Sequence, residues 1–255
     1  AWGRAWSRLD PLHRRFRHAL PPVGPECKEV RFLGRGQHGN GKHVCGLSTL
    51  PPRRLLPRGS GFSDECVVLS LGSGNNWDFE FGVHSNTSCV VHTFDCSVDG
   101  AVPAQMRSRV FFHKICVGGK HTLIPEDRAP PAAMLTVKPY FGLLSYLGLD
   151  RAPMLVKMDV DGAEFDVMRR IMMELEADPA TERLLPPQIA MAIHHTVHRV
   201  GVSQHIVSWA SRGKTAGELL AFVLQMYTMG YRLSYIDWET ASPFALEVIF
   251  SRVFC

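Results

Sequence analysis

From residue 66 onward, short apolar runs alternate with segments in which apolar residues recur at helical spacing. The runs predict strands over 67–71, 89–95, 109–116, 154–159, 188–194, 231–237 and 244–253. The intervening segments predict a helix that begins near Asn75 or Asn76, and further helices over 140–149, 163–175 and 218–229. This alternation is typical of an α/β fold with a mostly parallel sheet and crossover helices. The last two strands are joined by a connection too short for a crossover, so we expect them to be antiparallel.

Turn and capping residues divide these elements. Thr215 is predicted to cap the helix over 218–229, and Gly230 to end it. Pro125, Pro130 and Pro131 predict a loop between the third strand and the helix over 140–149. Residues 1–25 form a basic, proline-containing lead-in, and residues 26–62 are predicted to form an irregular cap or a short hairpin packed on the main domain. The main domain is predicted to span residues 63–255.

The length of 255 residues suits one large α/β domain. The formal charge of +4 comes largely from arginines near the front of the chain, so we expect no basic face and no nucleic-acid partner. No apolar run reaches the ~18 residues that a membrane-spanning helix needs. The chain begins at Ala1, and we expect a fragment from which a signal or anchor is missing. The oligomeric state is not indicated.

Seven cysteines show neither a C-x-x-C pair nor zinc-ligand spacing, and no metal site is predicted. Four of them lie in or beside predicted strands, where small buried apolar side chains are expected: Cys66, Cys89, Cys96 and Cys116. Cys27 and Cys45 could form a disulfide in an oxidising compartment. We therefore expect the lumen of the secretory pathway, with the cytoplasm as the alternative.

The first strand of the main domain ends in Gly72, Ser73 and Gly74. Glycines after a buried strand allow backbone to approach a ligand closely, and a helix starting near Asn75 would direct its N–H groups toward that ligand. Asp95 ends the second strand, 23 residues after Gly72, close to the offset at which an acid binds ribose hydroxyls. These residues predict a nucleotide-cofactor site. The alternatives are a tight turn and a strand-terminating acid.

Charged residues gather where the fourth strand ends. Lys157 lies in that strand, Asp159 is its last residue, and Asp161 and Glu164 follow. Asp161 is expected to cap the next helix, with Glu164 as its capping-box partner. Asp159 is the better site candidate, as a contact to the ligand, a metal ligand or a general base.

Two histidines, His194 and His195, follow the fifth strand, and alternation lets only one of them face a cleft. A histidine at a strand end is suited to accept the proton of a substrate hydroxyl, and Asp159 could orient it. A purely structural histidine is the alternative.

Five stretches occur in an order that resembles the FkbM-type methyltransferases: VVLSLGSGNNWDFE (67–80), VHTFDCS (91–97), FHKICVG (112–118), LVKMDVDGAEFDVM (155–168) and QIAMAIHH (188–195). The stretch GNGKHVC at 39–45 is similar to one in the eukaryotic methyltransferase-like branch. The resemblance implies a Rossmann-like class I fold with seven strands, the last antiparallel. It also implies the cofactor S-adenosylmethionine and O-methylation of a hydroxyl, often on a sugar.

Carried over by position, the resemblance places Gly72, Ser73 and Gly74 at the methionine and ribose end of the cofactor and Asp95 at the ribose hydroxyls. Cys116 and Val117 would border the adenine, and Asp159 would lie near the sulfonium or the substrate. The full candidate cofactor set is Gly72, Ser73, Gly74, Asn75, Asp95, Cys96, Cys116, Val117 and Asp159, and the candidate catalytic set is Asp159, His194 and His195. The acceptor is expected to be a small molecule or a glycan.

Two positions depart from the family pattern. Ser70 stands where an acid usually precedes the first glycine by two residues, and Ala192 stands where a glutamate usually precedes the fifth-strand histidine. These departures leave open a degenerate, non-catalytic binding or interaction module. A second enzyme class also remains, because Asp159 and Asp161 form the D-x-D of metal-dependent glycosyltransferases.

Overall fold

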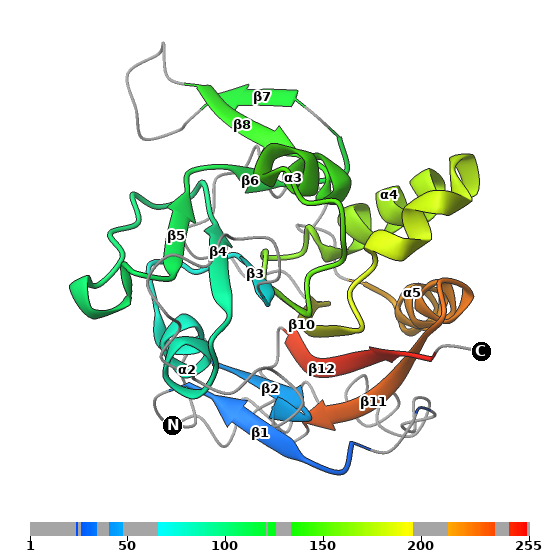
Figure 1. The fold of residues 1–255 in the computed structure, drawn as a ribbon. Coiled ribbons are helices and arrows are strands. Elements are labelled where there is room, and N and C mark those ends of the chain that lie inside the picture. Colours follow the sequence, from blue (N-terminus) through cyan, green and yellow to red (C-terminus); the bar gives the residue numbers. More distant parts are fainter. Residues whose placement is uncertain are drawn as a thin grey trace, which may run out of the picture.

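The structure is a computed structural model that describes residues 24, 27–34, 41–47, 66–120, 122–125, 134–195, 214–237 and 245–253. Its centre is a seven-stranded sheet in the order β11-β12-β10-β9-β3-β4-β5 (Figure 1). The strands are β3 (Val67–Leu71), β4 (Val90–Phe94), β5 (Val110–His113), β9 (Leu155–Met158), β10 (Gln188–His194), β11 (Tyr231–Asp237) and β12 (Ala245–Arg252). Neighbours from β10 to β5 are parallel, whereas β12 is antiparallel to both β10 and β11. The predicted class I architecture is confirmed.

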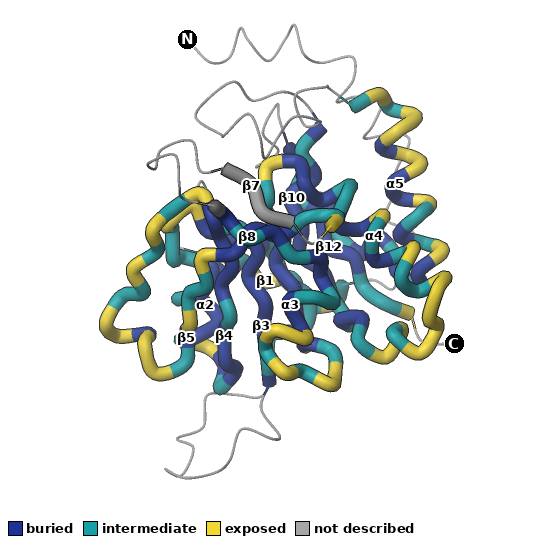
Figure 2. The backbone as a smooth tube through the Cα atoms, turned by 90° about the horizontal axis from the view of Figure 1, so that it is seen from above, coloured by how far each residue is buried: buried dark blue, intermediate teal, exposed yellow. Residues whose placement is uncertain are grey.

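Helices cover both faces of this sheet. Helix α2 (Asp78–Asn86) packs on one face, and helices α3 (Tyr140–Leu147), α4 (Glu164–Ala177) and α5 (Ala216–Thr228) pack on the other (Figure 1). Two 3₁₀ helices, η3 (Ala104–Met106) and η4 (Pro179–Leu184), were not predicted. The central strands are buried along most of their length, as Figure 2 shows. Their sequences are therefore nearly continuous apolar runs, as expected of parallel strands covered on both faces.

The ends of α5 follow the prediction, but the start of α2 does not. Thr215 and Glu218 form a capping box at the start of α5, and Gly230 has a φ of +84° just after it. Helix α2 begins only at Asp78, because Asn75 adopts a φ of +61° that ends the turn. The side chain of Asn76 then accepts a hydrogen bond from the Asp78 N–H at 3.0 Å.

The predictions for residues 109–138 are wrong in two respects. Strand β5 stops at His113, and β6 (Cys116–Val117) belongs to a separate accessory sheet in the order β6-β8-β7. Two strands that were not predicted, β7 (Thr122–Pro125) and β8 (Met134–Lys138), flank the predicted proline-rich loop, whose Pro130 and Pro131 lie outside the described residues. Pro125 is compatible with a strand here because β7 lies at an edge of its sheet.

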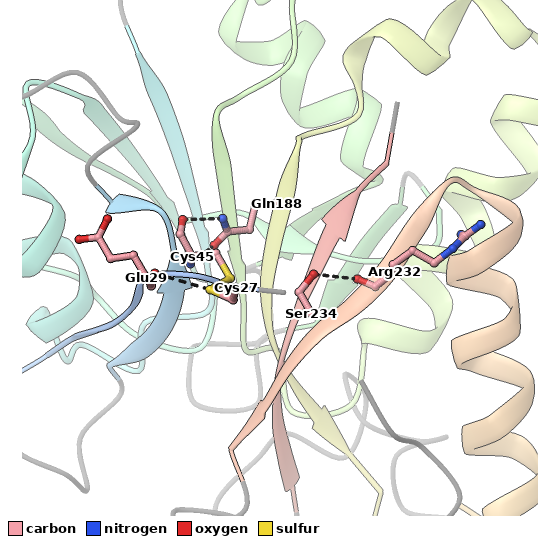
Figure 3. Close-up of a disulfide and its surroundings, with 6 residues drawn as sticks. All are labelled: Cys27, Glu29, Cys45, Gln188, Arg232 and Ser234. Carbon is pink, nitrogen blue, oxygen red and sulfur yellow. Dashed lines mark hydrogen bonds between the residues drawn. A yellow bond between two sulfur atoms is a disulfide. The ribbon is translucent and has the colours of Figure 1, made fainter. Parts of the chain in front are cut away.

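The N-terminal segment contains the hairpin that was one of two predicted alternatives. Strands β1 (Val30–Leu33) and β2 (Lys42–Cys45) are antiparallel, and their buried residues pack against α2. The backbone of Cys45 exchanges two hydrogen bonds, at 2.8 and 2.9 Å, with the side chain of Gln188 on β10 (Figure 3). The hairpin is thereby fixed to the central sheet.

Six cysteines form disulfides: Cys27–Cys45, Cys66–Cys89 and Cys96–Cys116. The first pair was considered from the sequence and is confirmed. The other four cysteines are buried as predicted, but they are paired. The register explains Cys66–Cys89, because Val67 lies opposite Val90 and the preceding residues therefore lie side by side. Cys255 lies outside the described residues.

Candidate active site

The turn after β3 requires glycine at its first position. Gly72 has a φ of +78°, and a Cβ atom there would lie 1.8 Å from the carbonyl oxygen of Asp159. Gly74 also has a positive φ, of +56°. The turn consequently lies directly against the end of β9, and any larger residue at 72 would separate the two.

The carboxylate of Asp95 holds this turn in place. Its Oδ2 accepts hydrogen bonds from the N–H groups of Ser73 and Gly74, both at 2.7 Å. Its Oδ1 accepts bonds from the N–H and the hydroxyl of Ser97, at 2.8 and 2.7 Å. A carboxylate offers about four lone-pair positions, so Asp95 is fully engaged by its own chain. Its role as the organiser of the turn was not foreseen from the sequence.

A solvent-open pocket lies at the carboxyl ends of β3, β4 and β9. Residues of five kinds line it, namely glycines, carboxylates, cysteines, apolar side chains and one serine: Gly72, Gly74, Phe94, Asp95, Cys96, Ser97, Cys116, Val117, Asp159, Val160, Asp161 and Ala163. Seven predicted cofactor residues are therefore brought together. Ser73 is buried behind the turn, and Asn75 lines a separate groove with Trp77 and Phe81.

Asp159, which lines the pocket, belongs to an ion-pair network centred on a buried lysine. The ammonium of Lys42, on the hairpin strand β2, lies 2.7 Å from Asp159 and 2.9 Å from Glu247 on β12. Burial alone would raise the pKa of Asp159, but Lys42 and Lys157 hold this pKa well below its ordinary value. Asp159 is therefore a firmly ionised carboxylate and a poor proton acceptor. Sequence reasoning missed Lys42 and Glu247, although Lys42 lies within the GNGKHVC stretch.

His194 is oriented by Glu164 and not by Asp159. Its Nδ1 lies 2.8 Å from the fully buried Glu164, whereas its Nε2 lies 3.7 Å from both Asp159 and Asp161. Burial lowers the pKa of His194, but Glu164, Asp159 and Asp161 outweigh this effect and raise the pKa to about 9. At neutral pH, His194 is thus mainly an imidazolium.

The predicted capping box at the start of α4 is absent. The cap position is Ala163 and no side chain caps the helix, while Asp161 adopts a φ of +51° in the turn before it. Glu164 accepts a hydrogen bond from the N–H of Val160 at 3.1 Å, in addition to its contact with His194. Glu164 is therefore part of the site rather than a cap.

The second candidate histidine, His195, is buried, and its carbonyl oxygen accepts a hydrogen bond from the N–H of Lys214 at 2.7 Å. Among the described residues that line the pocket, neither histidine is present. The Nε2 atom of His194 lies 3.7 Å from Asp159 and from Asp161, and both of these carboxylates line the pocket. Of the two histidines, His194 therefore retains the better geometry for chemistry.

The structure also places the two unusual positions. Ser70 is fully buried and pairs in register with Lys157 and Thr93 on the neighbouring strands, away from the pocket-lining residues. Ala192 lies directly opposite Glu247 in the β10–β12 ladder. Because opposite residues on antiparallel strands share a face, Glu247 supplies a carboxylate beside the position where the family glutamate was expected.

Comparison with known proteins identifies the domain. A family model described as a methyltransferase domain matches residues 13–200. The chain belongs to this methyltransferase family. It is therefore placed among enzymes that use S-adenosylmethionine as the methyl donor. A search of curated proteins finds no match.

Three solved structures give distant matches to the methyltransferase. The fibrillarin pre-rRNA processing protein of Methanococcus jannaschii is 8% identical, with 91% of this chain and 86% of that chain covered and a TM-score of 0.41. The 1,6-didemethyltoxoflavin-N1-methyltransferase of Burkholderia thailandensis, solved with S-adenosylhomocysteine, is 14% identical, with 74% and 71% covered and a TM-score of 0.38. LepI, solved with SAH, is 10% identical with a TM-score of 0.39; 78% of this chain is covered, and the match spans 46% of LepI. Scores this low support no further argument.

The residues of the pocket fit an adenosyl group. Phe94, Val117 and Ala163 offer apolar surface for a ring, and the hydroxyl oxygen of Ser97 offers an acceptor for a diol beside Asp95, whose own lone pairs are taken by the chain. Within the described ranges, no group of three or more His, Cys, Asp or Glu side chains could hold a metal ion. The family match does not support the glycosyltransferase alternative.

None of the helices described is long and apolar enough to cross a membrane.

Proposed function

We propose that this methyltransferase is of the FkbM type and O-methylates a hydroxyl group of a sugar or another small molecule. The observation that carries the proposal is the meeting, in one pocket, of the glycine turn and Asp95 with the carboxylates of Asp159 and Asp161. Carboxylates that face a pocket accept hydrogen bonds from hydroxyl groups, and a polyhydroxylated acceptor offers several.

The compartment is a second part of the proposal. Three disulfides support an oxidising location such as the secretory lumen.

One end of the pocket is suited to the cofactor. Gly72 and Gly74 allow close backbone approach, Ser97 beside Asp95 would receive the ribose hydroxyls, and Cys116 and Val117 would border the adenine. S-adenosylmethionine supplies an electrophilic methyl group on a sulfonium. The protein contributes mainly position, since such a transfer needs little covalent chemistry from the enzyme.

The other end must receive the proton that the acceptor hydroxyl loses. We assign this role to His194, with Glu164 as the residue that orients it through Nδ1. Because the pKa of His194 is raised to about 9, the histidine becomes a good acceptor only in alkaline solution. Asp161 is the alternative acceptor, because partial desolvation of its carboxyl group together with the neighbouring carboxylates raises its pKa despite His194.

Calorimetric titration with S-adenosylmethionine and S-adenosylhomocysteine tests the first step. We expect saturable binding of both, and absence of binding at millimolar ligand would favour a degenerate module. Transfer of an isotope-labelled methyl group to a panel of methyl glycosides and phenols tests the second step. If the protein binds the cofactor but labels only amines or thiols added to the panel, O-methylation is the wrong chemistry.

The pH dependence of that transfer identifies the base. A rate that rises with pH up to about 9 indicates His194. A rate that is already constant at neutral pH indicates Asp161. If His194 is the base, His194→Gln should abolish the rise of the rate with pH. If Asp161 is the base, Asp161→Asn should abolish the constant rate at neutral pH.

A further inference from the structure

The disulfide between Cys96 and Cys116 forms part of the pocket wall. Both cysteines line the pocket, and only 6% and 4% of their surfaces are exposed. The buried side chains of Leu135 and Val137 on β8 pack around them. The bond joins the segment after β4 to β6 of the accessory sheet, so it connects two elements that belong to different sheets.

The residues on either side of Cys96 hold the glycine turn. Asp95 receives the N–H groups of Ser73 and Gly74, and Ser97 donates two hydrogen bonds to Asp95. A covalent bond at Cys96 therefore restrains the short backbone segment from which the turn is organised. Without it, the position of Asp95 depends on noncovalent contacts, such as the bond from its N–H to the carbonyl of His113 at 3.1 Å.

The other partner of the disulfide lies on a short element. Strand β6 has only two residues, and it is held to β8 by two register pairs and by the hydrogen bond from Gly118 N–H to the Lys138 carbonyl, at 3.0 Å. Such a short ladder is weakly stabilised by itself. The disulfide is the covalent link that keeps this wall against the Asp95 segment.

We propose that the Cys96–Cys116 disulfide is a positioning element of the cofactor pocket, so that the site is complete only when these two cysteines are oxidised. The inference rests on the proposed function, because it concerns the same pocket. A dithiol reductant would supply two electrons and two protons, giving two thiols while the dithiol closes to its own disulfide. The pocket would then lose affinity because its turn and wall must be ordered on binding.

The chain contains a matched control. The Cys66–Cys89 disulfide closes a loop with a sequence separation of 23 residues, against 20 for Cys96–Cys116. In the chain-entropy description, the two bonds should contribute similar stability. Cys66 and Cys89 precede β3 and β4 and lie at the amino ends of these strands, opposite the pocket. Loss of this bond should lower the Tm without disturbing the cofactor site.

The experiment compares the full chain with C96A/C116A and C66A/C89A. We expect both double variants to show a similar fall in Tm. The Kd for S-adenosylmethionine, measured by calorimetry, should rise at least about tenfold in C96A/C116A and less than about twofold in C66A/C89A. Equal Kd values in the two variants would overturn the inference. Absence of binding by the oxidised wild-type protein would instead overturn the proposed function.

A second measurement uses the wild-type protein without ligand, so it does not depend on whether the cysteine variants fold. Amide hydrogen exchange at Ser73 and Gly74 is followed in the ligand-free wild-type protein before and after treatment with dithiothreitol, with mass spectrometry to count the bonds opened. Exchange at these two amides should accelerate at least about tenfold when Cys96–Cys116 opens. Unchanged exchange after this bond has opened would contradict the proposal.

Discussion

The two ends of the pocket are built in different ways. The proposed cofactor end joins Ser73 and Gly74 to Asp95 through backbone N–H groups, and the bonded residues lie 21 or 22 positions apart in the chain. The acceptor end joins Lys42 to Asp159 and Glu247 through side-chain charges, across 117 and 205 positions. One end is a local feature of two adjacent strands, and the other closes only when the hairpin, β9 and β12 have met.

The two ends are therefore sensitive to different substitutions. Backbone N–H groups cannot be removed by most substitutions, so the cofactor end depends on one acceptor, Asp95. The acceptor end depends on charge balance, because a buried carboxylate that loses its cation is costly. Changes at one end should therefore leave the other largely intact, and the following expectations test that separation.

The largest effect is expected at Lys42. Lys42→Met removes the ammonium that pairs directly with both Asp159 and Glu247 and should lower the free energy of unfolding by about 3–5 kcal/mol. The cofactor Kd should change by less than about threefold. Urea unfolding and calorimetry measure the two quantities. Lys114→Met is the control, since its partner Asp99 is 89% exposed and the pair should contribute at most about 1 kcal/mol. Equal losses in both variants would contradict a buried, energetically important network.

Asp95→Asn should act on the opposite end. The amide loses the charge that four hydrogen bonds share, and its NH₂ group places a donor against donors. We expect the Kd for S-adenosylmethionine to rise about 100-fold, equivalent to about 3 kcal/mol. Asp99→Asn, at an exposed carboxylate nearby in the chain, should leave Kd unchanged. A Kd for Asp95→Asn within a factor of about three of the wild-type value would show that the turn does not need this acceptor.

The charge on His194 predicts a pH dependence of stability. Its folded-state pKa, about 9, lies above the ordinary value of 6.5, so its contribution is fully present below pH 6.5 and is lost as the pH rises to about 9. We expect a loss of about 3 kcal/mol over this window. Glu164→Gln removes the main partner that raises the pKa, and should flatten the decline and lower the His194 pKa in an NMR titration. A decline of the same size in Glu164→Gln would assign it to other groups.

The smallest effect is expected at Asn75, where the backbone φ is +61°. Asparagine tolerates this conformation, whereas alanine should cost about 1 kcal/mol in the free energy of unfolding. Asn75→Gly should be close to neutral, because glycine adopts positive φ readily. Thermal unfolding of both variants provides the comparison. Equal stability of the two would mean that the turn can relax to a different conformation.

Much of the fold could be predicted because its signals are local. Apolar runs identified all seven strands of the central sheet, and Thr215 and Gly230 identified the ends of α5. The accessory sheet was missed because the prolines around Pro125 indicate a loop, and a strand at a sheet edge tolerates proline. The capping box at Asp161 was wrong because a long-range partner, His194, competes for Glu164.

The class of fold, the glycine turn and the position of Asp95 near it follow from the amino-acid sequence, because they depend on residue types and short spacings. Three contacts became visible only in the folded chain: Lys42 pairs with Asp159, Glu164 orients His194, and four buried cysteines form two disulfides. Each of these contacts depends on strand register and on the docking of segments far apart in the chain. Charge, hydrogen bonding and sulfur chemistry act over a few ångströms, and no local pattern of residues specifies which distant partner will arrive within that range.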